Sequence, residues 1–190
     1  ANNFAAFRGA AYHGQLDVMI RIIELCPDYT QHMIEFDNFY SFKYSASLGH
    51  LAVMEYLIVL APDNVQDMVE ANNFVAFRWA AENGHLEVME RLVELAPAHV
   101  QDMVEADNFG AFTGAMDMRE NEYLTVIERL LNFPSVFAYA EMQEHEYATC
   151  VQDFMNGRLA ILAQNIEALN VSHPNDVFDI VDIEQAKLYF

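Results

Sequence analysis

The fold of this chain is decided by residues 80–92, which read AAENGHLEVMERL. Related stretches begin 35 and 70 residues earlier, as SASLGHLAVMEYL at 45–57 and AAYHGQLDVMIRI at 10–22. Self-similarity at a fixed period is the sequence sign of a repeat array, in which each unit buries its apolar face against its neighbours. The chain is therefore predicted to be a solenoid of stacked repeats.

The repeat extends over nearly all of the 190 residues. Prolines, asparagines and phenylalanines recur in matching places, at Pro27, Pro62, Pro97, Pro134 and Pro174, at Asn3, Asn38, Asn73 and Asn108, and at Phe7, Phe42, Phe77 and Phe112. We predict a single array with units at 2–36, 37–71, 72–106, 107–144 and 145–182, and with 183–190 as the start of a further helix or a cap. The fourth unit carries an insertion near 119–122, and the fifth is eroded. Because both ends fall at a repeat junction, we expect the chain to be an excised fragment.

Each unit is predicted to hold two antiparallel helices and a short third one. In the third unit Gly84 follows the first helix, where glycine takes the left-handed conformation that ends a helix. The second helix begins at His85 or Leu86 and is apolar enough to need stacked neighbours. Pro97 then opens a segment whose apolar residues have helical spacing. Asparagine and aspartate at 72–73 and 107–108 are expected to cap the helix that follows.

The stretch 80–92 resembles the helix-turn-helix core of an ankyrin repeat, whose family pattern is A-A-x-x-G-H-L-x-V-V-x-x-L-L. Where the family opens its first helix with Thr-Pro-Leu-His, this chain has VAFR at 75–78. Where the family has Gly-Ala-Asp and a β-hairpin finger, this chain has the proline-led segment. We therefore expect an all-α, ankyrin-like α-solenoid of helix-turn-helix repeats with a short extra helix replacing the finger. The divergent pattern is similar to arrays in effectors of intracellular bacteria and in large DNA viruses.

The chain carries 9 basic against 29 acidic side chains, a formal charge of −20. Phosphate recognition needs clustered Lys and Arg, so this charge argues against nucleic acid and against acidic membrane surfaces as partners. A basic protein or peptide would be steered toward the chain, although an acidic surface also serves solubility alone. No apolar run is long enough for a membrane span, and the start does not read as a signal peptide. The sequence is cytoplasmic in character, which means the host cytoplasm if it is a secreted effector.

Cysteine and histidine give no chemical motif that the repeat does not explain. Cys26 stands where later units have Ala61 and Ala96, and Cys150 stands near a repeated Phe position, so both are expected to be buried packing residues. His145 and Asp153 near Cys150 leave a catalytic set open as an alternative. His50 and His85 fall at the turn position of the repeat and the other histidines at mostly different phases, so we predict no metal, no cofactor and no enzymatic activity.

The candidate binding residues are the outward positions of the first helices, which vary while the framework repeats. In ankyrin-like stacking these positions line the concave face, and large side chains there are typical interface anchors. The predicted partner-binding residues are Tyr12, His13, Tyr44, Leu48, Trp79, Glu82, Asn83 and Met118. The predicted groove is centred on Tyr44, Leu48 and Trp79. The alternative is that Tyr44 and Trp79 only fill space between adjacent first helices.

A second repeated feature is a basic residue at one phase of three units, Arg8, Lys43 and Arg78. These residues either form a positive stripe for an acidic partner or bond to loop carbonyls and neighbouring carboxylates. The second interpretation is favoured, because ion pairs at helix ends are frequent, and these residues would then take the place of the family's histidine.

The sequence thus predicts a protein-interaction module that binds a protein or peptide on the concave face of the array. Two alternatives remain open at this point. In the first, the chain is the substrate-recruiting region of a larger effector enzyme. In the second, it holds a catalytic site in its degenerate last units.

Overall fold

The computed structural model describes residues 4–117, 124–142 and 156–157. The described residues contain helices and no strand, in agreement with the all-α prediction. The elements are α1 Ala5–Tyr12, α2 Leu16–Leu25, η1 Pro27–Tyr29, α3 Thr30–Ser47, α4 Leu51–Leu60, η2 Pro62–Asn64, α5 Val65–Glu82, α6 Leu86–Leu95, η3 Pro97–His99, α7 Val100–Asp117, α8 Leu124–Leu131 and α9 Pro134–Met142. The chain divides into two compact units, 1–139 and 140–190, and the features described below lie in the first.

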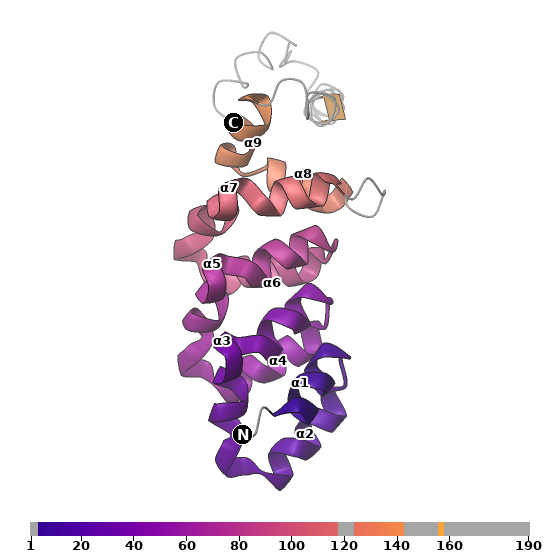
Figure 1. Ribbon diagram of the computed structural model, residues 1–190. Coiled ribbons are helices and arrows are strands. Elements are labelled where there is room, and N and C mark those ends of the chain that lie inside the picture. The colour runs from indigo at the N-terminus through magenta and orange to yellow at the C-terminus, as the bar shows by residue number, and fades with distance from the viewer. Residues whose placement is uncertain (1–3, 118–123, 143–155, 158–190) are drawn as a thin grey trace, which may run out of the picture. The chain divides into compact units, whose positions relative to one another are not determined.

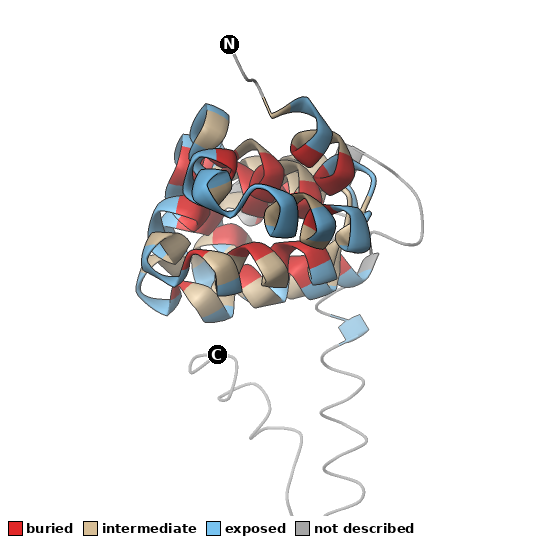
Figure 2. Ribbon diagram, turned by 90° about the horizontal axis from the view of Figure 1, so that it is seen from below, coloured by how far each residue is buried: buried red, intermediate tan, exposed pale blue. Residues whose placement is uncertain are grey.

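The helices stack unit upon unit, as Figure 1 shows for α3, α5 and α7. The first helix of each unit packs on its equivalent in the next, so α1 contacts α3, α3 contacts α5 and α5 contacts α7. The second helices α2, α4, α6 and α8 run beside them. Seen from below in Figure 2, the buried residues gather between the helices and the exposed ones lie on the outside. Each unit therefore buries its apolar side chains against its neighbours, as a solenoid requires.

The core is built from the residues that repeat. Phe7, Phe42, Phe77 and Phe112 of the first helices are 1%, 1%, 0% and 0% exposed. Alanines one turn later, such as Ala80 and Ala81, are also buried and are small enough for close helix approach. Methionines of the second helices, Met19, Met54 and Met89, complete the interior. The same side chain recurs because each unit meets nearly the same surface above and below.

The turn between the first and second helices depends on glycine. Gly14, Gly49 and Gly84 have φ of 66°, 71° and 76°, which confirms the left-handed conformation predicted for Gly84. A second constraint comes from the following unit. A Cβ atom on Gly14 would lie 2.8 Å from Nδ1 of His50, and one on Gly49 would lie 2.7 Å from Nδ1 of His85. Glycine is thus required for its backbone conformation and for the space it leaves.

The proline-led segment is helical, as predicted. Pro27, Pro62 and Pro97 each open a short 3₁₀ turn that leads into α3, α5 or α7. Each of these helices then kinks before it becomes the first helix of the next unit. In α5 the kink places Asn72, Asn73 and Phe74 in the left-handed region, with φ of 53°, 58° and 56°.

The kink is a costly conformation that recurs at 37–39 in α3 and at 107–109 in α7. Left-handed helical backbone costs about 1–2 kcal/mol per residue for L-amino acids, less for Asn and Asp. The third residue is a phenylalanine, and the rings of Phe39 and Phe74 are buried. Burial of one such ring contributes about 1.5–3 kcal/mol, which offsets part of that cost.

The polar residues at the kinks bond across the stack as well as shaping the turn. The Oδ1 atom of Asn72 accepts hydrogen bonds from Nδ2 of Asn38, at 2.6 Å, and from Nζ of Lys43, at 2.8 Å. A carboxylate oxygen of Asp107 accepts one from Arg78. These side chains were expected to cap helices, and the bonds that they make here link consecutive units instead.

The burial predicted for Cys26 is wrong. Its thiol is exposed, whereas Ala61 and Ala96 at the same position of later units are buried. Among the described residues α2 has a neighbouring second helix on one side only, and Leu25 and Tyr29 beside Cys26 are exposed for the same reason. The fourth-unit insertion, Cys150, His145, Asp153 and nearly all of the predicted fifth unit lie outside the described residues.

Candidate interaction surface

The repeated basic residues are engaged within the fold. Lys43 is 8% exposed, and its Nζ donates to the carbonyl oxygen of Asp37 at 3.1 Å and to Oδ1 of Asn72 at 2.8 Å. Burial lowers the pKa of Lys43, and the charge of Asp37 opposes that shift. Arg78 donates to the carboxylate of Asp107. For these two residues the predicted bonding to loop carbonyls and neighbouring carboxylates is confirmed.

Arg8 occupies the same position but makes a different contact. Its guanidinium carbon lies 5.0 Å from the ring centroid of Phe36 and 4.8 Å from that of Tyr40. A guanidinium over an aromatic face is attracted by the ring quadrupole. In the first unit the guanidinium of Arg8 therefore lies against aromatic rings, whereas the equivalent cations of the next two units bond to oxygen acceptors.

Histidines in the Gly-His turn connect consecutive units, a role that sequence reasoning did not assign. The Nε2 atom of His50 donates to the carbonyl oxygen of Tyr12, 3.0 Å away at the end of α1. His85 bonds in the same way to the carbonyl of Ser47 at the end of α3. Burial lowers the pKa of His85, while the bond to Ser47 opposes that shift. The recurrence of Gly-His at the turn was the signal that could have revealed this contact.

Four aromatic side chains gather on the first helices. Tyr44 of α3 lies at the centre, with ring centroids 4.2 Å from Tyr40, 5.8 Å from Tyr12 and 5.3 Å from Trp79. We call these four residues the aromatic row. Tyr12 is 41% exposed and the other three are half-buried. The row joins α1, α3 and α5, so it spans three consecutive units.

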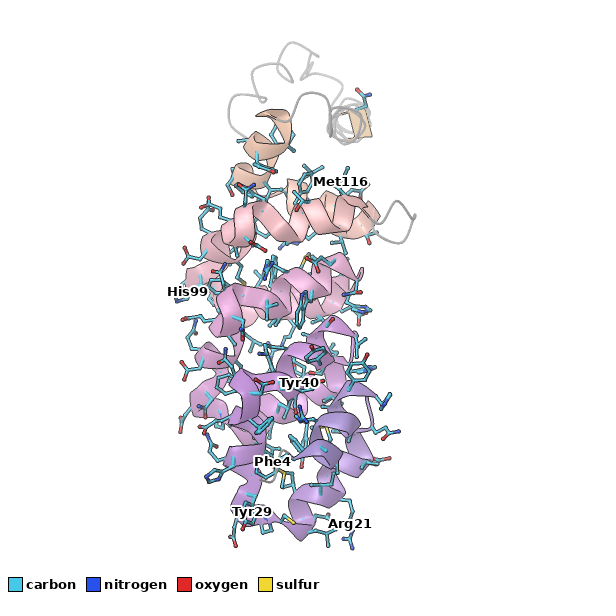
Figure 3. All side chains as sticks on the ribbon, viewed as in Figure 1. Phe4, Arg21, Tyr29, Tyr40, His99 and Met116 are labelled. Carbon is cyan, nitrogen blue, oxygen red and sulfur yellow. The ribbon has the colours of Figure 1, made fainter. Side chains whose placement is uncertain are left out.

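Tyr40, labelled in Figure 3, was not among the predicted site residues. It stands four residues before Tyr44, and residues at that spacing share a helix face. The two rings are stacked, with an interplanar angle of 30°. Burial and the neighbouring Tyr44 raise the pKa of Tyr40, so its hydroxyl stays neutral and remains a hydrogen-bond donor.

The structure brings most of the predicted site residues together. The ring centroids of His13 and Tyr12 lie 5.2 Å apart. Nδ2 of Asn83 donates to the carbonyl oxygen of Trp79 at 2.7 Å and to Oγ of Ser47 at 3.4 Å. Leu48 is half-buried just after α3, and Met118 lies outside the described residues.

Glycines stand on both sides of the two central aromatic residues. In equivalent positions of the four units the residues are Gly9, Tyr44, Trp79 and Gly114. A Cβ atom on Gly9 would meet nothing within 4 Å. On Gly114 it would overlap Cγ of Glu82, so the Glu82 side chain from α5 lies against the bare backbone of α7.

Glu82 is a half-buried carboxylate beside Trp79. Burial raises its pKa, Arg78 lowers it and Asp107 raises it. Within the described ranges, no hydrogen bond and no ion pair within 4 Å is formed by the Glu82 carboxylate. Arg78, the cation that acts on it, donates to Asp107 instead.

Unlike the first helices with their aromatic row, the second helices present charged side chains on their surface. Arg91 of α6 is 2.5 Å from a carboxylate oxygen of Glu55 on α4, and Arg129 of α8 is 3.5 Å from Glu90 on α6. The outer side of α4 is the exception, because Ala52, Tyr56 and Val59 stand where α6 has Glu87, Arg91 and Glu94. Val59 is 73% exposed. These residues provide matched controls for the aromatic row.

Other kinds of site find no support in the part of the chain that the structure describes. There, no group of three or more His, Cys, Asp or Glu side chains is placed to hold a metal ion. Nor is any helix of those residues long and apolar enough to cross a bilayer.

Repeated helix pairs with an identical buried row and a variable neighbouring row define an α-solenoid repeat protein. A search of solved structures assigns the family. An X-ray structure of an ankyrin repeat family protein from Legionella pneumophila matches with a TM-score of 0.80 and 36% sequence identity, over 94% of this chain. No family model matches the sequence, and no curated protein does.

The chain is an ankyrin repeat protein, as its Gly-His turns and stacked helix pairs indicate. It spans about half of the Legionella protein, 51% of that chain. The resemblance inferred from residues 80–92 is confirmed by this match. Ankyrin repeats generally serve as protein-interaction scaffolds.

Proposed function

We propose that this chain is a protein-interaction module whose aromatic row contacts the partner protein. The observation that carries the proposal is the contrast between two positions of the same helix. Phe42 and Phe77 are the same residue and are buried, whereas two residues later Tyr44 and Trp79 are half exposed and differ from unit to unit. Packing that repeats in every unit does not require such variation.

The chemistry of the row suits recognition. Tyr and Trp are enriched among interface residues that carry most of the binding energy, because they bury much apolar area and keep a polar group. The row is continuous across three units, so one extended partner segment contacts several rings at once. The glycine at position 9 leaves space next to Tyr44 for such a segment.

The contacts among the rings also fit the alternative, in which Tyr44 and Trp79 only fill space. Tilted or stacked pairs of this kind contribute about 0.5–1.5 kcal/mol each. The two interpretations differ in what truncation removes. A packing role predicts loss of the fold, and a recognition role predicts loss of binding from a folded chain.

The test is a capture experiment with a matched control. The native chain, the Tyr44→Ala/Trp79→Ala variant and the Tyr56→Ala/Val59→Ala variant are each used to retain proteins from a host-cell lysate. The second variant removes comparable apolar area from the outer side of α4. We expect the retained protein to be lost with the first variant and kept with the second. Equal retention by all three chains would contradict the proposal.

The resemblance to effectors supports a further part of the proposal. An ankyrin array of this kind would recruit a host protein in the host cytoplasm. A translocation reporter fused to the natural gene product tests this part separately. A reporter that never reaches the host cytoplasm during infection would refute the effector role without affecting the binding surface.

A further inference from the structure

Beside Trp79, the carboxylate of Glu82 creates a site that favours a positively charged ligand. Glu82 follows Trp79 by three residues on α5, so the two side chains share one helix face. The Glu82 side chain crosses to α7, where the missing side chain of Gly114 leaves room for it. Trp79 and Glu82 thus lie on the same face of α5, and the Glu82 side chain lies against the bare backbone of α7. We call Trp79, Glu82 and Gly114 the Trp79 seat.

Among the residues that the structure describes, no cation is in contact with the carboxylate of this seat. A buried or half-buried charge costs free energy unless a partner compensates for the lost water. Burial raises the pKa of Glu82, which shows that the site disfavours its charged form. Arg78 acts on the same carboxylate, but its side chain is bound to Asp107. An incoming cation would provide the missing partner.

The chain itself indicates which cation fits an aromatic face here. The guanidinium carbon of Arg8 lies 4.8 Å from the ring centroid of Tyr40, which stacks on Tyr44 of the same row. That of Arg129 lies 4.8 Å from the ring centroid of Phe133. A guanidinium is planar and weakly hydrated, so it stacks on a ring and still donates hydrogen bonds to a carboxylate at its edge.

We propose that the Trp79 seat binds an arginine side chain from a basic segment of the partner protein, with the guanidinium stacked on Trp79 and hydrogen-bonded to Glu82. This inference rests on the proposed function, because it assigns the partner chemistry of the same surface. The formal charge of −20 also favours a basic partner, because the chain attracts a basic segment over a distance before contact is made.

The test uses synthetic peptides and follows their binding by tryptophan fluorescence. Trp79 is the single tryptophan of the chain, so this fluorescence reports on the seat. One peptide is a flexible Gly-Ser sequence with spaced arginines, and the other has glutamine in place of each arginine. We expect the arginine peptide to change the Trp79 fluorescence with a saturable dependence on concentration at physiological salt. An equal response to the glutamine peptide would overturn the inference.

Two variants with the same charge change distinguish binding at the seat from general electrostatic attraction to an acidic protein. Glu82→Gln removes the carboxylate of the seat, and Glu87→Gln removes an exposed one on α6. We expect Glu82→Gln to weaken arginine-peptide binding about tenfold, and Glu87→Gln to weaken it less than about twofold. Equal losses in the two variants would overturn the inference.

A third variant moves the carboxylate without removing it. Gly114→Ala adds a Cβ atom that would overlap Cγ of Glu82, so the Glu82 side chain must shift. Alanine is the better helix former, so the fold is kept. We expect weaker arginine-peptide binding with no loss of helical signal in circular dichroism. Unchanged binding in this variant would count against the proposed geometry.

The same variants distinguish this inference from the proposed function. If a captured partner depends on Tyr44 and Trp79 but binds Glu82→Gln as tightly as the native chain, the arginine seat is wrong and the interaction surface stands. If the partner tolerates the Tyr44→Ala/Trp79→Ala variant, the proposed function fails, whatever the peptides do.

Discussion

Two rows of side chains lie two residues apart on the same helices and differ in almost every respect. The first row consists of Phe7, Phe42, Phe77 and Phe112, identical and at most 1% exposed. The second consists of Gly9, Tyr44, Trp79 and Gly114, which vary widely in size. A stacked unit meets the same surface at every step, so its packing residue is the same each time. The second row is free of that requirement, and its variation supports the proposed role in recognition.

The largest effect that this comparison predicts is on the first row. Phe77→Ala removes a ring from the centre of the stack, and truncation of a buried Phe costs about 3–5 kcal/mol. Urea unfolding followed by circular dichroism measures the loss, with Phe77→Leu as a milder control. A loss below about 1 kcal/mol would mean that the row does not carry the core, since substitutions that small are typical of surface sites.

A smaller effect is expected next to the first row, at Lys43. Lys43→Met removes the bonds from Nζ to Asp37 and Asn72 and leaves the partly buried carbonyl of Asp37 without this donor. Such a loss costs about 1–3 kcal/mol. Arg21→Met is the control, because Arg21 is exposed and its pair among the described residues is Glu24 on its own helix, a contact of about 0.5 kcal/mol or less. Equal losses would show that the link between units has no special weight.

The contact between units through His85 predicts a dependence on pH. Because the folded chain lowers the pKa of His85 below 6.5, the unfolded chain binds a proton in a window where the folded chain does not. Stability therefore falls as the pH drops from 6.5 through that window. His85→Gln should remove this part of the slope and cost about 1 kcal/mol at neutral pH through the lost hydrogen bond. An identical pH slope in the variant, measured by urea unfolding, would refute the contribution.

The smallest predicted effect has the opposite sign. Because the pKa of Glu82 is raised in the folded chain, its charged form is less favourable there than in the unfolded chain at pH 7. Glu82→Gln should therefore leave the stability unchanged or raise it by up to about 0.5 kcal/mol. Residues kept at the expense of stability are typical of functional surfaces. A clear destabilisation by Glu82→Gln, relative to Glu87→Gln in the same unfolding assay, would assign Glu82 to packing.

Within the described residues, the period of the sequence was enough to predict the helix pairs, the glycine turns and the helical segments that begin at Pro27, Pro62, Pro97 and Pro134. It could not predict the left-handed residues at the kinks, because Phe39 and Phe74 adopt that conformation through burial, which is a tertiary effect. Cys26 was misjudged because its register position is buried only where a neighbour covers it. Variation between units singled out Tyr44 and Trp79, whose rings are neighbours in the structure, and their role in binding stays a prediction. The placement of Glu82 against Gly114 was not predictable, since it depends on the distance between α5 and α7.

The central claim is that the second row contributes little to the fold that the first row holds together. The most direct test is the free energy of unfolding of the Tyr44→Ala/Trp79→Ala variant beside that of Phe77→Ala. We expect the double variant to lose about 1–2 kcal/mol, from its ring contacts, against about 3–5 kcal/mol for the single phenylalanine. A double variant that loses as much as Phe77→Ala, or more, would contradict the account.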